Sequence, residues 1–213
     1  IDAIKLGQSD IDLIILNNDL TSGIPDELIE SELPIYPSPL LGWHRRKKTN
    51  HFYFFNQLTI DLFDHLGCLD TFDPWILSTL YEEVDSIDIN LSEDRQKLYE
   101  VAKKLFSNIQ SYYNKYSISK KPYLFLKANS GTYGMGVVAI HSPEDILDLN
   151  RKARNKLFKG KSSVPITSYI LQEGVYSNLT VSNQSAEMVV YSIHNQPVGS
   201  FYRINSKKSD IDN

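Results

Sequence analysis

Residues 124–140, with the sequence LFLKANSGTYGMGVVAI, hold one lysine and three glycines between two apolar runs. Lys127 stands near the end of the first run, and the three glycines fall between Ser130 and Gly136. Glycine allows the positive φ angles of an anion-binding loop and lets backbone N–H groups approach a ligand closely. The segment therefore predicts a loop that holds phosphate oxygens, with the Lys127 ammonium as an added point charge.

The order of lysine and glycines differs from two common phosphate-binding motifs. In the P-loop the lysine follows the glycines, whereas Lys127 precedes them. The dinucleotide fingerprint leads into a helix, whereas the residues after Gly136 are typical of a strand. A glycine-rich hairpin that only turns the chain stays open as an alternative, because short glycine motifs are weak signals. Lys127 favours the anion site, because a charge inside an apolar strand is costly without a partner.

Other polar residues stand on strands that follow along the chain. Gln172 and Glu173 end an apolar strand and could meet an adenine edge and a ribose hydroxyl, with an exposed strand end as the alternative. Glu187 and Arg203 fall on the two arms of a predicted hairpin around residues 194–197. The planar guanidinium of Arg203 suits a phosphoryl group, and a salt bridge with Glu187 is its alternative.

Composition limits the possible partners. The chain has 213 residues and a formal net charge of −4, so no overall positive field favours nucleic acid. A single cysteine, Cys68, excludes an internal disulfide and a cysteine-based zinc site, and suits a reducing cytoplasm. No apolar stretch approaches the roughly 20 residues that a membrane helix needs.

The hydrophobic pattern predicts a mixed α/β chain that becomes rich in strands from about residue 122. Strands are expected within residues 11–20, 122–128, 136–142, 168–176, 186–193 and 197–204. Helices are expected over residues 50–66, 91–116 and 143–157, with Asn50, Ser92 and Ser142 as caps. The apolar face of the second helix would consist of Leu98, Ala102, Leu105, Ile109 and Tyr112.

These parts, in this order, resemble the ATP-grasp superfamily and, within it, the proteobacterial type III glutamate–cysteine ligases. The resemblance rests on the segments NNDL, GWHRRK, HF, DPW, KANSGTYGMGV, LNRKARNK, QEGVY, AEMVVY and GSFYRI. It implies an α/β (α+β) fold, with a Rossmann-like part over residues 1–118 and a strand-rich nucleotide-binding part with an antiparallel sheet over residues 119–213. The chain starts at Ile1 and stops at Asn213, and we expect a fragment that lacks both termini and is inactive alone.

The resemblance also implies the residues of an ATP site. Lys127 would lie on the phosphates, and Arg203 would bind the transferred γ-phosphoryl group, which makes these two the expected catalytic residues. The other implied nucleotide contacts are Ser130, Gly131, Thr132, Tyr133, Gly134, Met135, Gly136, Gln172, Glu173, Val175, Glu187 and Asn213. Arg45 and Arg46 could bind substrate carboxylates, with a solvated loop as the alternative.

The implied activity joins glutamate to cysteine at the expense of ATP. The γ-carboxylate of glutamate would take the phosphoryl group, and the amine of cysteine would displace phosphate to give γ-glutamylcysteine, the first step of glutathione biosynthesis. Mg²⁺ is implied as well, with ligands expected beyond residue 213. The resemblance implies a cytoplasmic enzyme with small-molecule substrates, and its oligomeric state stays open. Two alternatives remain: another ATP-grasp carboxylate–amine ligase of the glutathione-synthetase type, and an ATP-binding module without catalysis.

Overall fold

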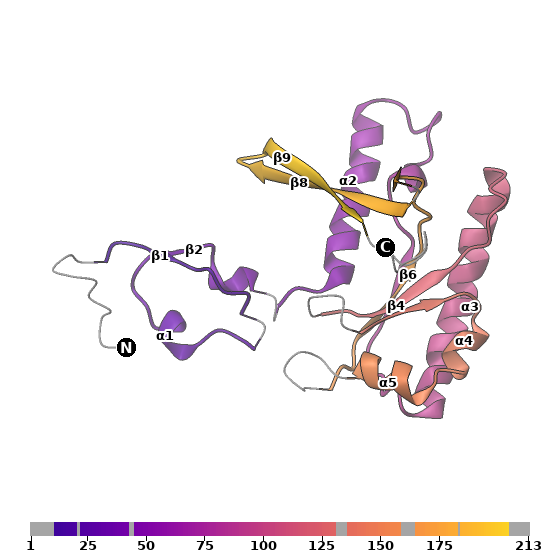
Figure 1. Cartoon of the computed structure of the whole chain (residues 1–213), viewed down its shortest axis with the longest axis horizontal. Helices are drawn as coiled ribbons and strands as arrows, with labels where there is room; N and C mark the ends of the chain where they lie inside the picture. The colour runs from indigo at the N-terminus through magenta and orange to yellow at the C-terminus, as the bar shows by residue number, and fades with distance from the viewer. Residues whose placement is uncertain are drawn as a thin grey trace.

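The computed structural model describes residues 11–20, 22–42, 45–130, 136–158, 165–182 and 184–204. In chain order its elements are β1 (Ile14–Ile15), α1 (Asp26–Ile29), β2 (Ile35–Tyr36), η1 (Pro39–Leu41), α2 (Lys48–His65), η2 (Pro74–Ile76), β3 (Tyr81–Val84), α3 (Ser92–Lys115), β4 (Leu124–Ala128), β5 (Val137–Ile140), α4 (Glu144–Leu147), α5 (Arg151–Phe158), β6 (Tyr169–Glu173), β7 (Thr180–Val181), β8 (Gln184–Ile193) and β9 (Gln196–Ile204), where η marks a short 3-10 helix (Figure 1). No helix in these ranges is both long and apolar enough to cross a membrane.

A four-stranded sheet forms the centre of the described structure. Its strand order is β3-β6-β4-β5, and each neighbouring pair is antiparallel. A second sheet has the order β7-β8-β9, while β1 and β2 form a short parallel pair. The expected mixed α/β class with an antiparallel sheet is confirmed. Because β3 pairs with β6, the central sheet contains residues from both sides of position 118, and the division there stays a prediction.

The two faces of the central sheet have different surroundings. Leu124 and Leu126 of β4 and Leu171 of β6 belong to the main core, which they share with Leu98 and Ile109 of α3. Figure 1 shows α3, α4 and α5 grouped on one side of β4, with α2 apart from them. Residues in β4 alternate between buried and half-buried positions, as a strand with one core face requires. The half-buried positions of β4 therefore form the other face of the sheet.

The starts of the two long helices differ from the prediction. α2 begins at Lys48, two residues before the expected cap Asn50, because acceptors on Asn129 satisfy the first N–H groups of the helix. Ser92 is the first residue of α3 and not its cap, and no side chain caps that helix. The expected buried face of α3 is correct except at its end, where Tyr113 is buried and Tyr112 is not.

The helix predicted over residues 143–157 is two helices. α4 ends at Leu147, and α5 begins at Arg151. The Asn150 side chain accepts a hydrogen bond from Ala153 N at 2.9 Å, which stabilises a new helix start. Ser142 does not cap α4; instead the Asp145 carboxylate accepts from the backbone before that helix.

Two strands also differ from the prediction. The strand expected within residues 11–20 is only Ile14–Ile15. The strand β3 was not predicted, because its sequence YEEV places two acidic residues at its centre, where strand propensity is low. Its pairing with β6 forms the strand nonetheless.

Substitution Gly174→Ala should destabilise the fold. A Cβ at this position would lie 2.2 Å from Cε2 of Tyr123, whose side chain is 1% exposed and whose hydroxyl donates to Val175 O. We expect the free energy of unfolding in urea to fall by about 1–3 kcal/mol. Gly199→Ala is the control, because a Cβ there meets nothing within 4 Å. Equal unfolding midpoints for the two variants would contradict the prediction.

Candidate anion-binding site

Lys127 is the fourth residue of β4, on the sheet face away from α3. Its Nζ donates a hydrogen bond to Oε1 of Gln172 on the neighbouring strand at 2.8 Å, and it lies 4.7 Å from the centre of the Phe125 ring. In the part of the chain that the structure describes, no carboxylate forms an ion pair with Lys127. The face predicted for Lys127, alongside Phe125 and opposite Leu126, is confirmed. The ammonium is therefore held by a neutral oxygen and an aromatic ring.

A second lysine, Lys48, reaches the same place from the first turn of α2. Its Nζ donates to Ala128 O at 2.6 Å and lies 3.4 Å from Ser130 O. The sequence analysis did not single out this residue. Lys48 belongs to the basic run HRRKK (residues 44–48), but the helix was expected to begin at Asn50, which left Lys48 in a loop.

The two ammonium groups influence each other. Burial, and secondly the charge of Lys48, lowers the pKa of Lys127 to about 8. Burial also lowers the pKa of Lys48. Two cations that share a partly desolvated place repel each other until an anion binds between or beside them. The pair is therefore suited to a multiply charged anion.

The two ends of the glycine-rich segment, Ser130 and Gly136, lie beside these lysines. Ala128 N donates to Gly136 O at 2.9 Å, so both ends of the segment lie together at the end of β4. Gly136 has a φ of +68°, and a Cβ there would lie 3.3 Å from the Cβ of Ala128. The expected contacts Gly131, Thr132, Tyr133, Gly134 and Met135 lie outside the described residues, as does Asn213.

Gln172 and Glu173 point to opposite faces of the sheet. The Gln172 side chain is on the Lys127 face, where it accepts the lysine hydrogen bond. The Glu173 carboxylate is buried on the α3 face, where it accepts from Trp75 Nε1 and Leu80 N, both at 3.1 Å. Burial raises the pKa of this carboxyl group. The structure therefore brings Gln172 together with Lys127 and does not bring the Glu173 carboxylate there.

The remaining predicted nucleotide and substrate residues have other contacts or are exposed. Val175 is exposed beyond the end of β6. Arg203 Nε donates to Glu187 Oε1 across the β8–β9 register, which is the salt bridge that the sequence left open as an alternative. Figure 1 draws this hairpin apart from β4. Arg46 Nε donates to Leu41 O at 2.9 Å, and Arg45 lies beside it in the turn before α2.

Among the described residues, no three histidine, cysteine, aspartate or glutamate side chains are placed to hold a metal ion.

The fold and the site define a protein with an α+β architecture and a lysine pair at the base of a glycine-rich segment. A family model described as glutamate-cysteine ligase matches residues 2–213. The chain therefore belongs to the glutamate–cysteine ligase family.

A solved structure from Methylobacillus flagellatus KT, named as a gamma-glutamylcysteine synthetase, is similar to this chain, with a TM-score of 0.82 and 34% sequence identity. The match covers 97% of this chain and 48% of that chain, so this chain spans about half the length of that protein. A search of curated proteins gave no match.

Removing the charge of Lys127 should stabilise the fold. Because the folded-state pKa of Lys127 is lowered from 10.5 to about 8, the protonated side chain costs stability below that pH. The cost disappears as the pH rises from the folded to the unfolded pKa. We expect Lys127→Met to raise the free energy of unfolding at neutral pH by about 1–3 kcal/mol, and the gain to vanish by about pH 10.

Denaturant titrations at several pH values measure this effect. Lys103→Met, at an exposed position of α3, is the control and should change stability little. A Lys127→Met variant that is less stable than the parent at neutral pH would assign the lysine a structural role.

Proposed function

We propose that this chain contains the nucleotide-binding part of an ATP-dependent glutamate–cysteine ligase with an ATP-grasp fold. The observation that supports this most is the placement of Lys127 and Lys48, from two different elements, at the base of a glycine-rich segment. Triphosphate fits this place, because its negative charge is attracted by two neighbouring ammonium groups. Membership of the family supports the choice of substrates.

Each residue of the site has a proposed role. Lys127 and Lys48 would bind phosphate oxygens, and the segment from Ser130 to Gly136 would close over them. Gln172, which shares the face of Lys127, would contact the adenine together with the chain around Val175. For Glu173 the main chain is the proposed contact, because its carboxylate is used by Trp75 and Leu80. Glu187 would support this network, and Arg203 would bind the transferred phosphoryl group.

In the proposed reaction the chain mainly positions the substrates and neutralises the charge of the phosphates. The γ-carboxylate of glutamate attacks the γ-phosphorus of ATP, and ADP leaves. The resulting acyl phosphate is then attacked by the amine of cysteine, which forms the peptide bond and releases phosphate. A closed glycine-rich segment would exclude water, which otherwise hydrolyses the acyl phosphate.

Other parts of the proposal rest on the family alone. A divalent metal, with Mg²⁺ expected, would accompany the ATP phosphates, and the described residues hold no cluster of three histidine, cysteine, aspartate or glutamate side chains for it. Cytoplasmic glutathione biosynthesis is the proposed setting. The division at residue 118 is proposed as the boundary between the two parts of the chain.

Affinity for ATP should depend on pH through Lys127. The lysine is proposed to bind phosphate as an ammonium, and its pKa of about 8 in the free protein means that it loses the proton above that pH. The dissociation constant for ATP, measured by calorimetry, should therefore rise up to about tenfold per pH unit above pH 8. Lys127→Arg keeps its charge, so its dissociation constant should stay nearly constant over the same range. If the dissociation constant of the parent protein does not change with pH over this range, Lys127 does not bind the phosphates of ATP.

The reaction itself is tested with the intact protein that carries this chain. With ATP, Mg²⁺ and glutamate, phosphate release should require cysteine, and mass spectrometry should identify γ-glutamylcysteine as the product. Glycine replaces cysteine as the control acceptor and should give no product. Release with glycine or γ-glutamylcysteine as acceptor, but not with cysteine, would identify another ligase. Tight ATP binding without release would identify a binding module.

A further inference from the structure

Asn129 lies between β4 and the glycine-rich segment, two residues after Lys127. It is fully buried. Its N–H donates to Ser168 O at 3.0 Å, and its carbonyl oxygen accepts from Lys48 N at 2.8 Å. The backbone of this one residue therefore joins the start of α2 to the segment that leads into β6.

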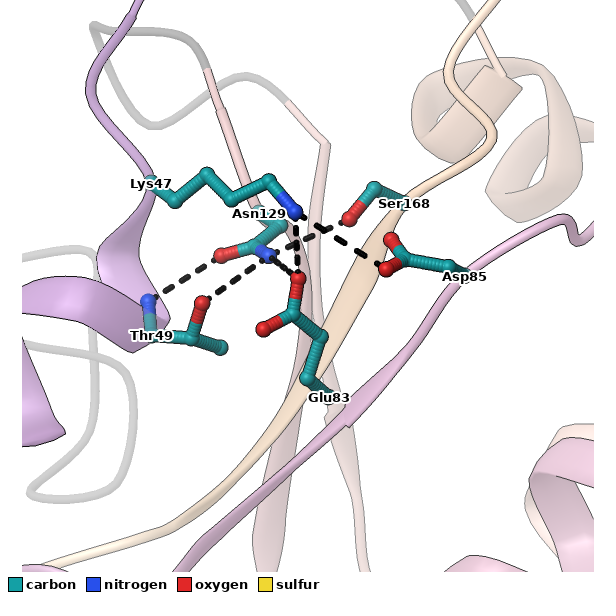
Figure 2. Close-up of polar contacts among 6 residues, drawn as sticks. All are labelled: Lys47, Thr49, Glu83, Asp85, Asn129 and Ser168. Atoms are coloured by element: carbon teal, nitrogen blue, oxygen red, sulfur yellow. Dashed lines mark hydrogen bonds and ion pairs between the residues drawn. The ribbon is translucent and has the colours of Figure 1, made fainter.

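The Asn129 side chain adds hydrogen bonds to three elements, as Figure 2 shows. Oδ1 accepts from Thr49 N at 3.1 Å. Nδ2 lies 2.8 Å from Glu83 Oε1 on β3, 3.1 Å from Thr49 Oγ1 and 3.1 Å from Ser168 Oγ. A single buried amide thus connects α2, β3 and the start of the glycine-rich segment.

The partners determine which way the amide points. The backbone N–H of Thr49 can only donate, and the Glu83 carboxylate can only accept. Lys47 Nζ forms an ion pair with the same Glu83 oxygen at 2.7 Å, so this oxygen accepts from both the Asn129 amide and the Lys47 ammonium. An aspartate in place of Asn129 would set a second carboxylate against Glu83. The place therefore requires a neutral amide.

These bonds determine where Lys48 stands. The first two residues of α2, Lys48 and Thr49, both donate their backbone N–H groups to Asn129. The Lys48 ammonium can then reach Ala128 O at 2.6 Å, next to Lys127 on the same strand. One turn further along α2, the Phe52 ring also contacts the Tyr81 ring of β3.

We propose that Asn129 is a positioning residue of the nucleotide site, whose amide determines where Lys48 stands relative to Lys127 and where the glycine-rich segment begins. The proposal rests on the proposed binding of ATP. Asn129 itself contacts no substrate in this proposal. Glu83 accepts a hydrogen bond from the Asn129 amide, so an amide and not a carboxylate is needed at position 129.

The test uses one variant and its compensating partner. Asn129→Asp places two carboxylates together, so at about pH 7.5 the dissociation constant for ATP should rise about tenfold or more. Affinity should return near pH 5.5, relative to the parent at that pH, because the two carboxyl groups then share a proton and one can donate again. The double variant Glu83→Gln, Asn129→Asp exchanges amide and carboxylate and should bind ATP like the parent protein at pH 7.5.

Asn56→Asp is the matched control. Asn56 is a side-chain amide on α2, and it bonds to Thr79 on both sides, with Nδ2 donating to the carbonyl oxygen at 2.9 Å and Oδ1 accepting from the N–H at 3.1 Å. Its substitution should lower the thermal stability and leave the dissociation constant for ATP unchanged. Asn129→Asp with parental affinity, or a loss that neither pH nor Glu83→Gln reverses, overturns the proposal.

Two further measurements cover other outcomes. If Asn129→Asp does not fold, Asn129→Ser removes the bonds to Glu83 and Thr49 without adding a charge, and it should weaken ATP binding at every pH. If the parent protein binds no ATP, the proposed function fails, but the positioning role can still be measured. Nuclear magnetic resonance titration of isotopically labelled lysine should then show a higher pKa for Lys127 in Asn129→Ser, because Lys48 has moved away. An unchanged Lys127 titration overturns the positioning role.

Discussion

A lysine ammonium inside a β-sheet loses much of its hydration, and the sheet gives the Lys127 ammonium only the amide oxygen of Gln172 and the ring of Phe125 in return. This arrangement persists because the opposite face of the same strands packs Leu124 and Leu126 against α3. Burial of that apolar face is worth several kcal/mol by the usual value of about 25 cal/mol per Å². Burial of the apolar face therefore offsets the desolvation cost of Lys127, for which one neutral hydrogen bond and one ring contact compensate only in part.

The second cation depends on a different kind of contact. Lys48 is brought to the site by the first turn of a helix, and that turn is held by a buried polar network instead of apolar packing. Hydrogen bonds have strict requirements for direction and for donor and acceptor, so such a network defines a position more narrowly than a hydrophobic contact does. An anion that contacts ammonium groups from two elements needs both of them at the right distance from each other. If one ammonium is displaced, the anion can no longer contact both at once.

Local patterns in the sequence predicted the parts of the site that local rules control. Alternation in β4 placed Lys127 on the face away from the core, and the hairpin of Glu187 and Arg203 followed from its turn. The position of Lys48 could not be found in this way, because α2 starts where Asn129, 80 positions away in sequence, accepts its N–H groups. The direction of the Glu173 carboxylate likewise depends on Trp75, from an element distant in the chain.

The two proposed catalytic cations, Arg203 and Lys127, differ in their surroundings and in their partners. Arg203 is paired with Glu187 on an exposed hairpin, with 66% of its side chain accessible, and exposed ion pairs contribute only about 0–1 kcal/mol. A phosphoryl group could therefore take the place of Glu187 at little cost. Within the described ranges no carboxylate pairs with Lys127, so an anion that binds it does not have to displace one of these groups. The pairing of Arg203 with Glu187 is thus compatible with its proposed role, because a weak exposed partner positions the cation without competing strongly for it.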